Sequence, residues 1–352
     1  MSYQVEILPI GAIIEVQEGQ SILDASLRQG VYLPHACNHG LCATCKVDIL
    51  EGEVDYGEAS PFALMDTERS EGKCLVCTAT AKSDCVIEAD IDEDIDAQSI
   101  PVQDFVGTVI EVTALTPRIL GVVLELDHNI SFQAGQYVQY CVPHIEEPRA
   151  FSIASSSNRK NVIELNISLV PDGEVTPWIH ENTKVGGNYQ LSGPFGRFFV
   201  RESAKKPMIF FAGGSGLSSP KSMIEEQLEN GNSLPITLFH GARNEEELYY
   251  AELFAEYEKK YENFTYIPVL SDEDIEKWDG HQGFLGEVAA GIYENDFSGN
   301  KAYLCGPPLM IESCITALMR GRLYEKDIYI EKFFSKADLN NATVKSPLFK
   351  SI

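Results

Sequence analysis

Three cysteines early in the chain are spaced so that they could hold an iron–sulfur cluster. Cys37, Cys42 and Cys45 form a C-x4-C-x2-C pattern, and Cys77 stands farther along the chain as a fourth cysteine. This spacing with a distant fourth cysteine is typical of a [2Fe–2S] cluster, in which four thiolates bind two irons. The loop must be tight enough for its backbone N–H groups to point at the sulfurs, and Gly40 leaves room for that. The pattern therefore predicts a one-electron redox centre.

The spacing by itself leaves alternatives open. Cys74 and Cys85 compete with Cys77 for the fourth position. Structural zinc is a second interpretation, but zinc sites favour two paired CxxC or CxxC/HxxxH units, which the x4 gap fits poorly. His35 and His39 flank the loop, yet a Rieske-type site needs histidines in place of two cysteines. All four cysteines are present, so we interpret both histidines as ordinary loop residues.

A second group of residues could bind a cofactor that contains phosphate. The apolar run over residues 208–212 predicts a strand, and it is followed directly by Gly213, Gly214, Ser215 and Gly216. Glycines let the backbone approach a pyrophosphate, and the N-terminus of a following helix stabilises its charge. The run is not the G-x-G-x-x-G fingerprint, so a plain strand-to-helix turn remains an adequate alternative.

The cysteine loop needs a scaffold, and the surrounding pattern predicts a small α+β domain over residues 1–95. Ser21 can cap one short helix over residues 22–29. An acidic run follows and predicts an extended linker over residues 96–103. Alternating apolar residues and turn signals predict strands at 3–7, 12–16, 46–50, 73–78 and 85–91.

The rest of the chain changes its pattern near residue 206. Residues 104–205 are rich in strands and predict an antiparallel barrel. Residues 206–335 alternate strands and helices, which predicts a parallel sheet flanked by helices. The expected barrel strands are 105–112, 119–126, 137–142, 149–154, 162–170 and 189–191. The expected strands of the parallel sheet are 208–212, 236–240, 265–270 and 302–305, with helices at 219–229, 245–259 and 308–319. The tail, 336–352, fits neither pattern.

Composition and charge exclude several classes of function. The net charge of −26 argues against nucleic acid as a partner, because phosphates repel such a chain. Residues 1–100 hold 19 Asp and Glu against 5 Lys and Arg, a net of −14. That surface suits docking of a basic partner, or serves solubility alone. The sequence has no signal-peptide pattern and no apolar run of about 18 residues, so we expect a cytoplasmic protein without a membrane span.

Several motifs in the middle of the chain resemble those of the ferredoxin–NADP reductase superfamily. Arg149-Ala150-Phe151-Ser152 resembles its R-x-Y-S flavin motif, with phenylalanine in place of tyrosine. Gly173-Glu174-Val175-Thr176 resembles its G-x-x-T/S phosphate loop. Gly193-Pro194-Phe195-Gly196-Arg197-Phe198 resembles the stretch that closes its flavin domain. The resemblance implies bound FAD, with Arg149 offsetting the pyrophosphate charge, Phe151 flanking the isoalloxazine and Ser152 donating to flavin N5.

The C-terminal third carries the matching nicotinamide motifs. Gly213–Leu217 with Pro220 resembles the GGTGxxP loop, although three residues and not two separate Gly216 from Pro220, and Tyr303–Met310 resembles the CGPPxM signature. The resemblance implies that Cys305 lies beside nicotinamide C4, with Gly306 and Pro307 next to it. Glu331-Lys332-Phe333 resembles the terminal E-x-aromatic, in which the ring of Phe333 covers the flavin. We therefore expect Ser152, Cys305 and Glu331 to position hydride transfer.

The order of the expected domains resembles the reductases of bacterial multicomponent oxygenases, and phenol hydroxylase reductase components most of all. Cys77 then becomes the expected fourth cluster ligand, since those ferredoxin domains place it in an L-x-C context, as in Leu75-Val76-Cys77. The resemblance implies that electrons pass from NADH through FAD and the cluster to the hydroxylase of a diiron monooxygenase that acts on an aromatic substrate. A ring-hydroxylating dioxygenase or a separate electron carrier is an alternative client. A non-catalytic protein that binds zinc is the alternative from another class.

The choice of coenzyme depends on one loop. Glu245-Glu246-Glu247 follows the second expected strand of the parallel sheet and favours NADH. Arg243 could instead bind a 2′-phosphate, which would favour NADPH. We expect NADH.

Overall fold

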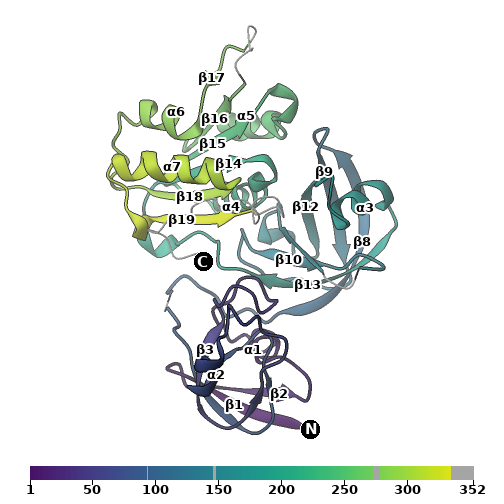
Figure 1. The fold of residues 1–352 in the computed structure, drawn as a ribbon. Coiled ribbons are helices and arrows are strands. Elements are labelled where there is room, and N and C mark those ends of the chain that lie inside the picture. Colours follow the sequence, from purple (N-terminus) through teal and green to yellow (C-terminus); the bar gives the residue numbers. More distant parts are fainter. Residues whose placement is uncertain (93, 146–147, 273–277, 334–352) are drawn as a thin grey trace. The chain divides into compact units, whose positions relative to one another are not determined.

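The ferredoxin-like part of the chain is a compact unit of its own. The computed structural model describes residues 1–92, 94–145, 148–272 and 278–333, so the tail predicted at 336–352 lies outside the described residues. The chain divides into a first unit, Met1–Gln103, and a second unit that begins at Asp104 (Figure 1). The domain limits at residues 95, 103, 205 and 335 stay predictions.

A five-stranded mixed sheet forms the first unit. Its strands run in the order β2-β1-β7-β3-β5, with β1 parallel to β7 and the other neighbours antiparallel. Val5 and Ile7 alternate inward from β1 into the core beneath α1. The elements of this sheet are β1 (Ser2–Leu8), β2 (Ala12–Gln17), α1 (Ile22–Arg28), β3 (Lys46–Glu51), β5 (Lys73–Leu75) and β7 (Cys85–Glu88). The sequence did not predict α2 (Asp66–Ser70) or the small sheet of β4 (Val54–Asp55) and β6 (Thr80–Ala81).

The segment predicted to be an extended linker is bound to the first unit at its end. The amide of Val102 donates to the carbonyl of Leu27 at 3.0 Å, and the Val102 side chain is buried. Ala97 also bonds back to the carbonyl of Asp94, which makes a turn. The turn at Ala97 and the contact of Val102 hold parts of the segment in place, so it is not freely extended along its whole length.

The second unit begins with a six-stranded antiparallel sheet that closes into a barrel. Its strands run in the order β11-β10-β13-β8-β9-β12, and Ile153, just after β11, pairs with Leu165 of β12. That bridge joins the two edges, as the strand-rich pattern predicted. The elements are β8 (Gln103–Ala114), β9 (Ile119–Leu126), β10 (Tyr137–Tyr140), β11 (Arg149–Ser152), β12 (Val162–Ser168), α3 (Val175–Asn182) and β13 (Asn188–Phe195).

A six-stranded parallel sheet with helices on both faces completes the second unit (Figure 1). The parallel sheet and its flanking helices were predicted, but the strands His281–Gln282 and Ile328–Lys332 and the helix Leu285–Ile292 were not. Met208, Phe210 and Ala212 face one core, and Ile209 and Phe211 face the other. The strands, in the order β17-β16-β15-β14-β18-β19, are β14 (Met208–Gly213), β15 (Ile236–Ala242), β16 (Phe264–Leu270), β17 (His281–Gln282), β18 (Lys301–Gly306) and β19 (Ile328–Lys332). The helices are α4 (Ser218–Glu229), α5 (Ala251–Lys260), α6 (Leu285–Ile292) and α7 (Pro308–Arg320).

One helix differs from its prediction for a clear physical reason. A continuous helix was expected over residues 245–259, but only a short 3-10 turn covers Glu245–Glu247, and α5 begins at Ala251. Between them Tyr250 has φ 59°, in the left-handed region that an α-helix does not contain. The side chain of Tyr250 reaches across to the barrel, where its hydroxyl bonds to Glu164 and Asn166. These tertiary contacts override the local helix pattern.

Candidate functional site

The cysteine loop is shaped to point backbone amides at sulfur atoms. The amides of His39 and Leu41 approach Cys37 Sγ at 3.5 and 3.4 Å. Gly40 has φ 69°, and a Cβ on it would lie 3.0 Å from the backbone oxygen of Glu58. A hydrogen bond from Cys45 and then the amide of Gly40 lower the pKa of Cys77 to about 7. The same bond raises the pKa of Cys45, so the amides are what favours negative charge on sulfur, those of His39 and Leu41 at Cys37 and that of Gly40 at Cys77. Iron requires its cysteine ligands as thiolates.

The structure favours Cys77 over its competitors as the fourth ligand. Cys45 Sγ lies 3.1 Å from Cys77 Sγ, although the two residues are 32 apart in sequence. Cys74 is fully buried among apolar side chains on β5, and burial raises its pKa to about 12. Cys85 Sγ bonds instead to the carbonyls of Glu53 and Ser83. Cys42 shares a side-chain hydrogen bond with Cys37, which makes a second close pair of thiols beside Cys45 and Cys77. Two pairs of thiols fit the two irons of a [2Fe–2S] cluster, although the role of these four cysteines as the ligand set stays a prediction.

The three residues expected to position hydride transfer meet at one carboxylate oxygen. Glu331 Oε2 receives the hydroxyl of Ser152 at 3.3 Å and the thiol of Cys305 at 3.6 Å. Ser219 adds a third donor at 2.9 Å. Ser152 ends β11 of the barrel, whereas Cys305 and Glu331 are paired neighbours on β18 and β19. The arrangement joins the flavin strand to the carboxyl ends of the parallel strands.

Burial sets the electrostatics of this cluster. Desolvation raises the pKa of Glu331 to about 7, while the donors from Ser219, Cys305 and Ser152 act against that shift. Burial also raises the pKa of the Cys305 thiol. Cys305 is therefore a neutral thiol near pH 7, and Glu331 changes its charge close to that pH. A group poised in this way can respond to charge on a neighbouring nicotinamide.

The other residues expected to hold FAD lie along β11 and at the start of α3. Ser152 is buried at the end of β11, Arg149 and Phe151 are half-buried, and Ala150 is exposed. Thr176 Oγ1 accepts from the amide of Val170 at 2.9 Å, which closes the loop that contains Gly173. Val175 begins α3, and the residue before it makes no side-chain cap bond. The helix N-terminus thus keeps donors that fit a phosphate.

The glycine loop lies against the end of strand β18, which contains Cys305. A Cβ on Gly216 would lie 2.5 Å from the carbonyl of Cys305, and one on Gly213 would lie 2.6 Å from Met310 Sδ. Gly214 has φ 57° with open space at its Cα. Gly216 is required because its clash would be with backbone, and Gly214 is favoured by its left-handed φ. The exposed backbone at Gly214 fits a pyrophosphate. Ser215 lies in the same 3-10 turn as Gly214 and Gly216. Phe333 lies at the end of the neighbouring strand, where its amide bonds to the carbonyl of Gly306 at 3.2 Å.

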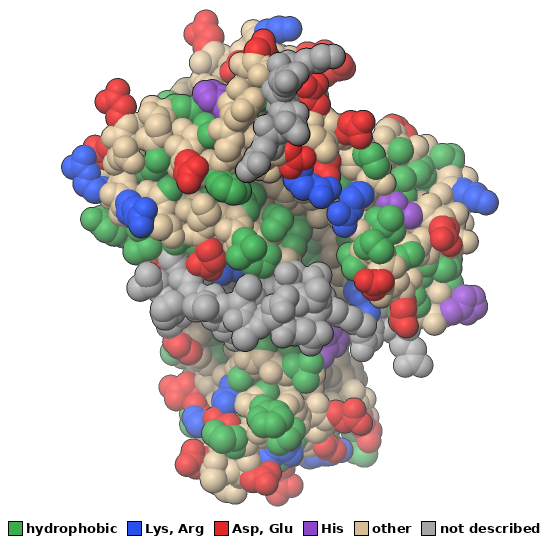
Figure 2. Space-filling view, turned by 45° about the horizontal axis from the view of Figure 1, so that its top comes forward, with side chains coloured by type: hydrophobic (Ala, Val, Ile, Leu, Met, Phe, Trp, Pro, Cys, Tyr) green, Lys and Arg blue, Asp and Glu red, His purple; other side chains and the backbone are tan. Residues whose placement is uncertain are grey.

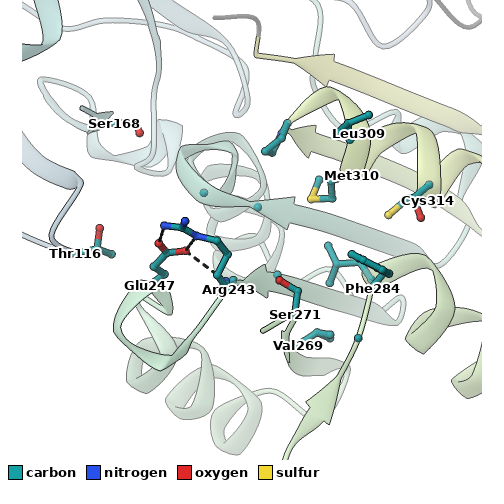
Figure 3. A pocket seen from close by; sticks show the side chains of 18 of the residues that line it. Thr116, Ser168, Arg243, Glu247, Val269, Ser271, Phe284, Leu309, Met310 and Cys314 are labelled. Atoms are coloured by element: carbon teal, nitrogen blue, oxygen red, sulfur yellow. Dashed lines mark hydrogen bonds and ion pairs between the residues drawn. The ribbon is translucent and has the colours of Figure 1, made fainter. Parts of the chain in front are cut away.

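A cavity of about 670 Å³ opens at the carboxyl ends of the parallel strands (Figure 3). Gly213, Gly241 and Pro307 line it, and so do Arg118 and Ser168 of the barrel. Its size and position suit a dinucleotide at the switch point of a parallel sheet. Arg243 and Glu247 lie at one wall, as in Figure 3, with Arg243 Nε 3.0 Å from Glu247 Oε2. The Arg243 guanidinium, which could otherwise bind a 2′-phosphate, is therefore bound to the Glu247 carboxylate.

Comparison with known proteins agrees with this geometry. Residues 5–82 match a 2Fe-2S iron-sulfur cluster binding domain, residues 107–200 an oxidoreductase FAD-binding domain and residues 210–315 an oxidoreductase NAD-binding domain. The whole chain is 52% identical to the whole reductase component of phenol 2-monooxygenase from Pseudomonas sp., over 353 residues. It is 54% identical to the whole phenol hydroxylase P5 protein of Acinetobacter pittii. The chain belongs to the family of oxygenase reductase components.

A solved structure supports the same assignment. The crystal structure of the Amycolatopsis reductase GcoB is 32% identical, with a TM-score of 0.84 over 94% of this chain and 98% of that one. Like other oxygenase reductase components, the chain is an NADH-dependent oxidoreductase that transfers electrons through FAD and a [2Fe–2S] cluster. The prediction of this family, of its fold and of its three cofactors is confirmed. No helix among the described residues is long and apolar enough to cross a membrane.

Sequence reasoning missed two residues of the site. Ser219 was expected only as the first residue of a helix, yet its hydroxyl is the nearest of the three donors to Glu331. Tyr249 donates from its hydroxyl to the carbonyl of Gly214 at 2.8 Å and so braces the glycine loop. Ser219 occupies a variable position just before Pro220 of the nicotinamide loop, and Tyr249 belongs to no quoted motif. No local pattern distinguishes the two from ordinary core and helix residues.

Proposed function

We propose that this oxygenase reductase component delivers its electrons to the hydroxylase of a phenol-oxidising monooxygenase, in the cytoplasm. The support is identity of 52% and 54%, over the full length of each chain, to the reductase component of phenol 2-monooxygenase and to the phenol hydroxylase P5 protein. A partner interface is shaped by the whole surface of a protein, and here no domain of the relatives is missing. We therefore expect the client of this chain to be the hydroxylase of a phenol-oxidising monooxygenase, as the names of these two relatives indicate for theirs.

The observation that carries the catalytic part of the proposal is the meeting of Ser152, Ser219 and Cys305 at Glu331 Oε2. FAD supplies the chemistry that links a two-electron hydride donor to a one-electron cluster. The chain supplies position and electrostatics. The Ser152 hydroxyl is held at the end of a barrel strand, where it can donate to the reacting edge of the flavin.

The remaining residues hold the two reactants and exclude water. Cys305 is buried and neutral, so it packs beside a nicotinamide ring without adding charge. Gly213, Gly214 and Gly216 bring the backbone close to the pyrophosphate of NADH, and Arg149 offsets the pyrophosphate charge of FAD. The thiolates of Cys37, Cys42, Cys45 and Cys77 hold the cluster that receives single electrons.

Reconstitution tests the proposed client. The purified reductase is mixed with the hydroxylase of a phenol monooxygenase or with the oxygenase of a ring-hydroxylating dioxygenase, each with its own substrate and NADH. We expect substrate oxidation coupled to NADH consumption with the first and much slower turnover with the second. Coupled turnover with the dioxygenase and none with the phenol hydroxylase would contradict the proposed client, while leaving the electron-transfer chain intact.

A further inference from the structure

A row of polar contacts joins the segment after β11 to helix α4. Ser222 Oγ donates to the carbonyl of Ser155 at 2.6 Å, and Ser156 Oγ donates to Glu229 Oε2 at 2.6 Å. The amide of Ser156 approaches Glu225 Oε2 at 3.3 Å. The row begins at the proposed hydride site, because Ser152, the last residue of β11, and Ser219 on α4 both donate to Glu331. We call these contacts between residues 152–158 and the residues 219–230 of and just after α4 the α4 seam.

Lys221 is the centre of the α4 seam. Its side chain is only 2% exposed, and its ammonium lies 3.0 Å from the carbonyl of Ala154, 3.0 Å from Glu164 Oε2 and 2.9 Å from Glu225 Oε1. An ammonium has three donors, so all of them are used. Burying a charge costs free energy unless such partners are present, and the partners here come from three separate segments. The contact therefore specifies one relative position of α4, β12 and the end of the flavin strand.

The network continues from Lys221 to the glycine loop. The ring of Tyr250 lies 5.0 Å from Lys221 Nζ, and its hydroxyl bonds to Glu164. Tyr250 has a left-handed φ of 59°, a conformation that costs free energy for a tyrosine and is held by these contacts. The neighbouring Tyr249 donates to the carbonyl of Gly214. Both ends of the nicotinamide loop, Gly214 and α4, are thus tied to the barrel by the same group of side chains.

We propose that Lys221 is a positioning residue for hydride transfer. It holds the first turn of α4 in register with residues 152–156, so that Ser219 and Ser152 reach the same oxygen of Glu331. The inference rests on the proposed role of Ser152 at the hydride site. A shift of one ångström between two reactants costs up to about 100-fold in rate, so a residue that touches neither reactant can govern it.

The test compares Lys221→Met and Lys221→Arg with Asn158→Ala. Asn158 bonds to Glu229 and Asn230 at the far end of the α4 seam, so it is a matched control for a contact that only stabilises. Three quantities are measured: the limiting rate of flavin reduction at saturating NADH, the FAD dissociation constant, and the long-wavelength charge-transfer absorbance that appears when NADH stacks on flavin. The last two do not depend on turnover.

We expect Lys221→Met to lower the limiting rate on the order of tenfold or more and to weaken the charge-transfer band while FAD stays bound. Lys221→Arg should restore part of both signals, and Asn158→Ala should leave them unchanged. A wild-type rate and band in Lys221→Met would overturn the proposal, and so would equal losses in Asn158→Ala.

Two further variants keep the result interpretable. If Lys221→Met loses FAD or fails to fold, Ser222→Ala decides, because it removes one neutral bond of the α4 seam and leaves no charge unpaired. Ser222→Ala should slow flavin reduction with FAD bound, and a wild-type rate would overturn the proposal. Ser152→Ala is measured in parallel. An unchanged rate there would reject the proposed hydride site itself, whereas a slow Ser152→Ala with normal seam variants would reject Lys221 alone.

Discussion

Glu331 is the residue at which Ser152 of the barrel meets Ser219 and Cys305 of the parallel-sheet part, and desolvation changes its pKa. Desolvation raises its pKa to about 7 from an ordinary 4.5. Between these two pH values the folded chain keeps a proton that the unfolded chain has lost. The stability that the neutral carboxyl contributes is therefore present below about pH 4.5 and is lost as the pH rises to about 7. Ionisation of Glu331 is also expected to change the limiting rate of flavin reduction.

We expect the limiting rate of flavin reduction to rise with pH through about 7 and to lose that inflection in Glu331→Gln. Hydride leaving NADH creates positive charge on the nicotinamide, which an ionised carboxylate stabilises and an amide does not. Stopped-flow reduction from pH 5.5 to pH 8.5 measures the profile. The stability advantage of Glu331→Gln over the wild type should also grow between pH 4.5 and 7. An inflection near pH 7 that persists in Glu331→Gln would assign it to another group.

Replacing Cys77 and replacing Cys74 should have different effects on the iron–sulfur cluster. Cys77→Ser is expected to remove the cluster, because a ligand at 3.1 Å from Cys45 is lost, while FAD stays bound in another domain. NADH reduction of ferricyanide, which takes electrons from flavin, should persist, and cytochrome c reduction through the cluster should fall. Cys74→Ser, in the apolar core, is the matched control and should keep the cluster absorbance. The opposite outcome would show that Cys74 is the ligand.

Glu247 is expected to disfavour NADPH through Arg243. Its carboxylate binds the Arg243 guanidinium and raises the pKa of Arg243, while the pKa of Glu247 itself is lowered. Glu247→Gln should free the guanidinium for a 2′-phosphate and raise kcat/KM for NADPH on the order of tenfold, with a smaller change for NADH. Glu246→Gln removes the same charge from an exposed neighbour and is the control. Equal effects of the two variants would mean that general repulsion, and not Arg243, decides.

At the scale of elements, the cysteine loop shows how backbone conformation and contact act together. Gly40 and Gly11 have similar left-handed φ angles, 69° and 65°. A Cβ on Gly40 would lie 3.0 Å from Glu58 O and from Thr78 Cγ2, whereas nothing lies within 4 Å of one on Gly11. The two glycines therefore separate the effect of φ from the effect of crowding.

We expect Gly40→Ala to destabilise the first unit by roughly 1–3 kcal/mol more than Gly11→Ala and to release the cluster more readily. Urea unfolding followed by the visible absorbance of the cluster measures both effects. FAD content should be unchanged in either variant. Similar midpoints for the two variants would show that the loop tolerates the added methyl group.

For the whole molecule, charge is the property that bears on the partner. Carboxylates are spread over the visible face in Figure 2 and do not gather in one patch. Glu51, Glu53, Asp55 and Glu58 lie within one short stretch of the first unit. All four are exposed, and Glu58 lies beside Gly40 of the cysteine loop. Asp55 is paired with Lys82 at 3.3 Å, so part of its charge is offset.

We expect coupling to the oxygenase to weaken with ionic strength, because the first 100 residues carry a net charge of −14. Flavin reduction by NADH occurs within the chain and should respond much less to salt. Neutralising Glu51, Glu53, Asp55 and Glu58 should lower coupled hydroxylation and leave ferricyanide reduction intact. The control neutralises four exposed carboxylates of the parallel-sheet part, Glu252, Glu256, Glu262 and Glu294. If both variants lose coupled hydroxylation equally, or if coupling does not change with ionic strength, the negative charge would contribute to solubility and not to docking.

The sequence by itself determined those features that depend on neighbours along the chain. The C-x4-C-x2-C spacing places three thiols on one loop, and the apolar run of residues 208–212 predicted a strand, which the structure shows to be buried throughout. Glycines after that strand predicted a phosphate loop. Most strands and helices were predicted within a few residues, since periodicity reports which face of an element is buried. Motif resemblance then supplied the cofactors.

Only the tertiary structure decided which distant side chains meet. Ser152 and Glu331 are 179 residues apart, and their contact depends on strand order, which no local period encodes. Tyr250 interrupts a predicted helix because its hydroxyl bonds to Glu164 of the barrel, and Lys221 is buried because three segments bring it partners. A charged lysine or a left-handed tyrosine is unfavourable locally. Each is stable here because packing and hydrogen bonds from the rest of the fold offset that cost.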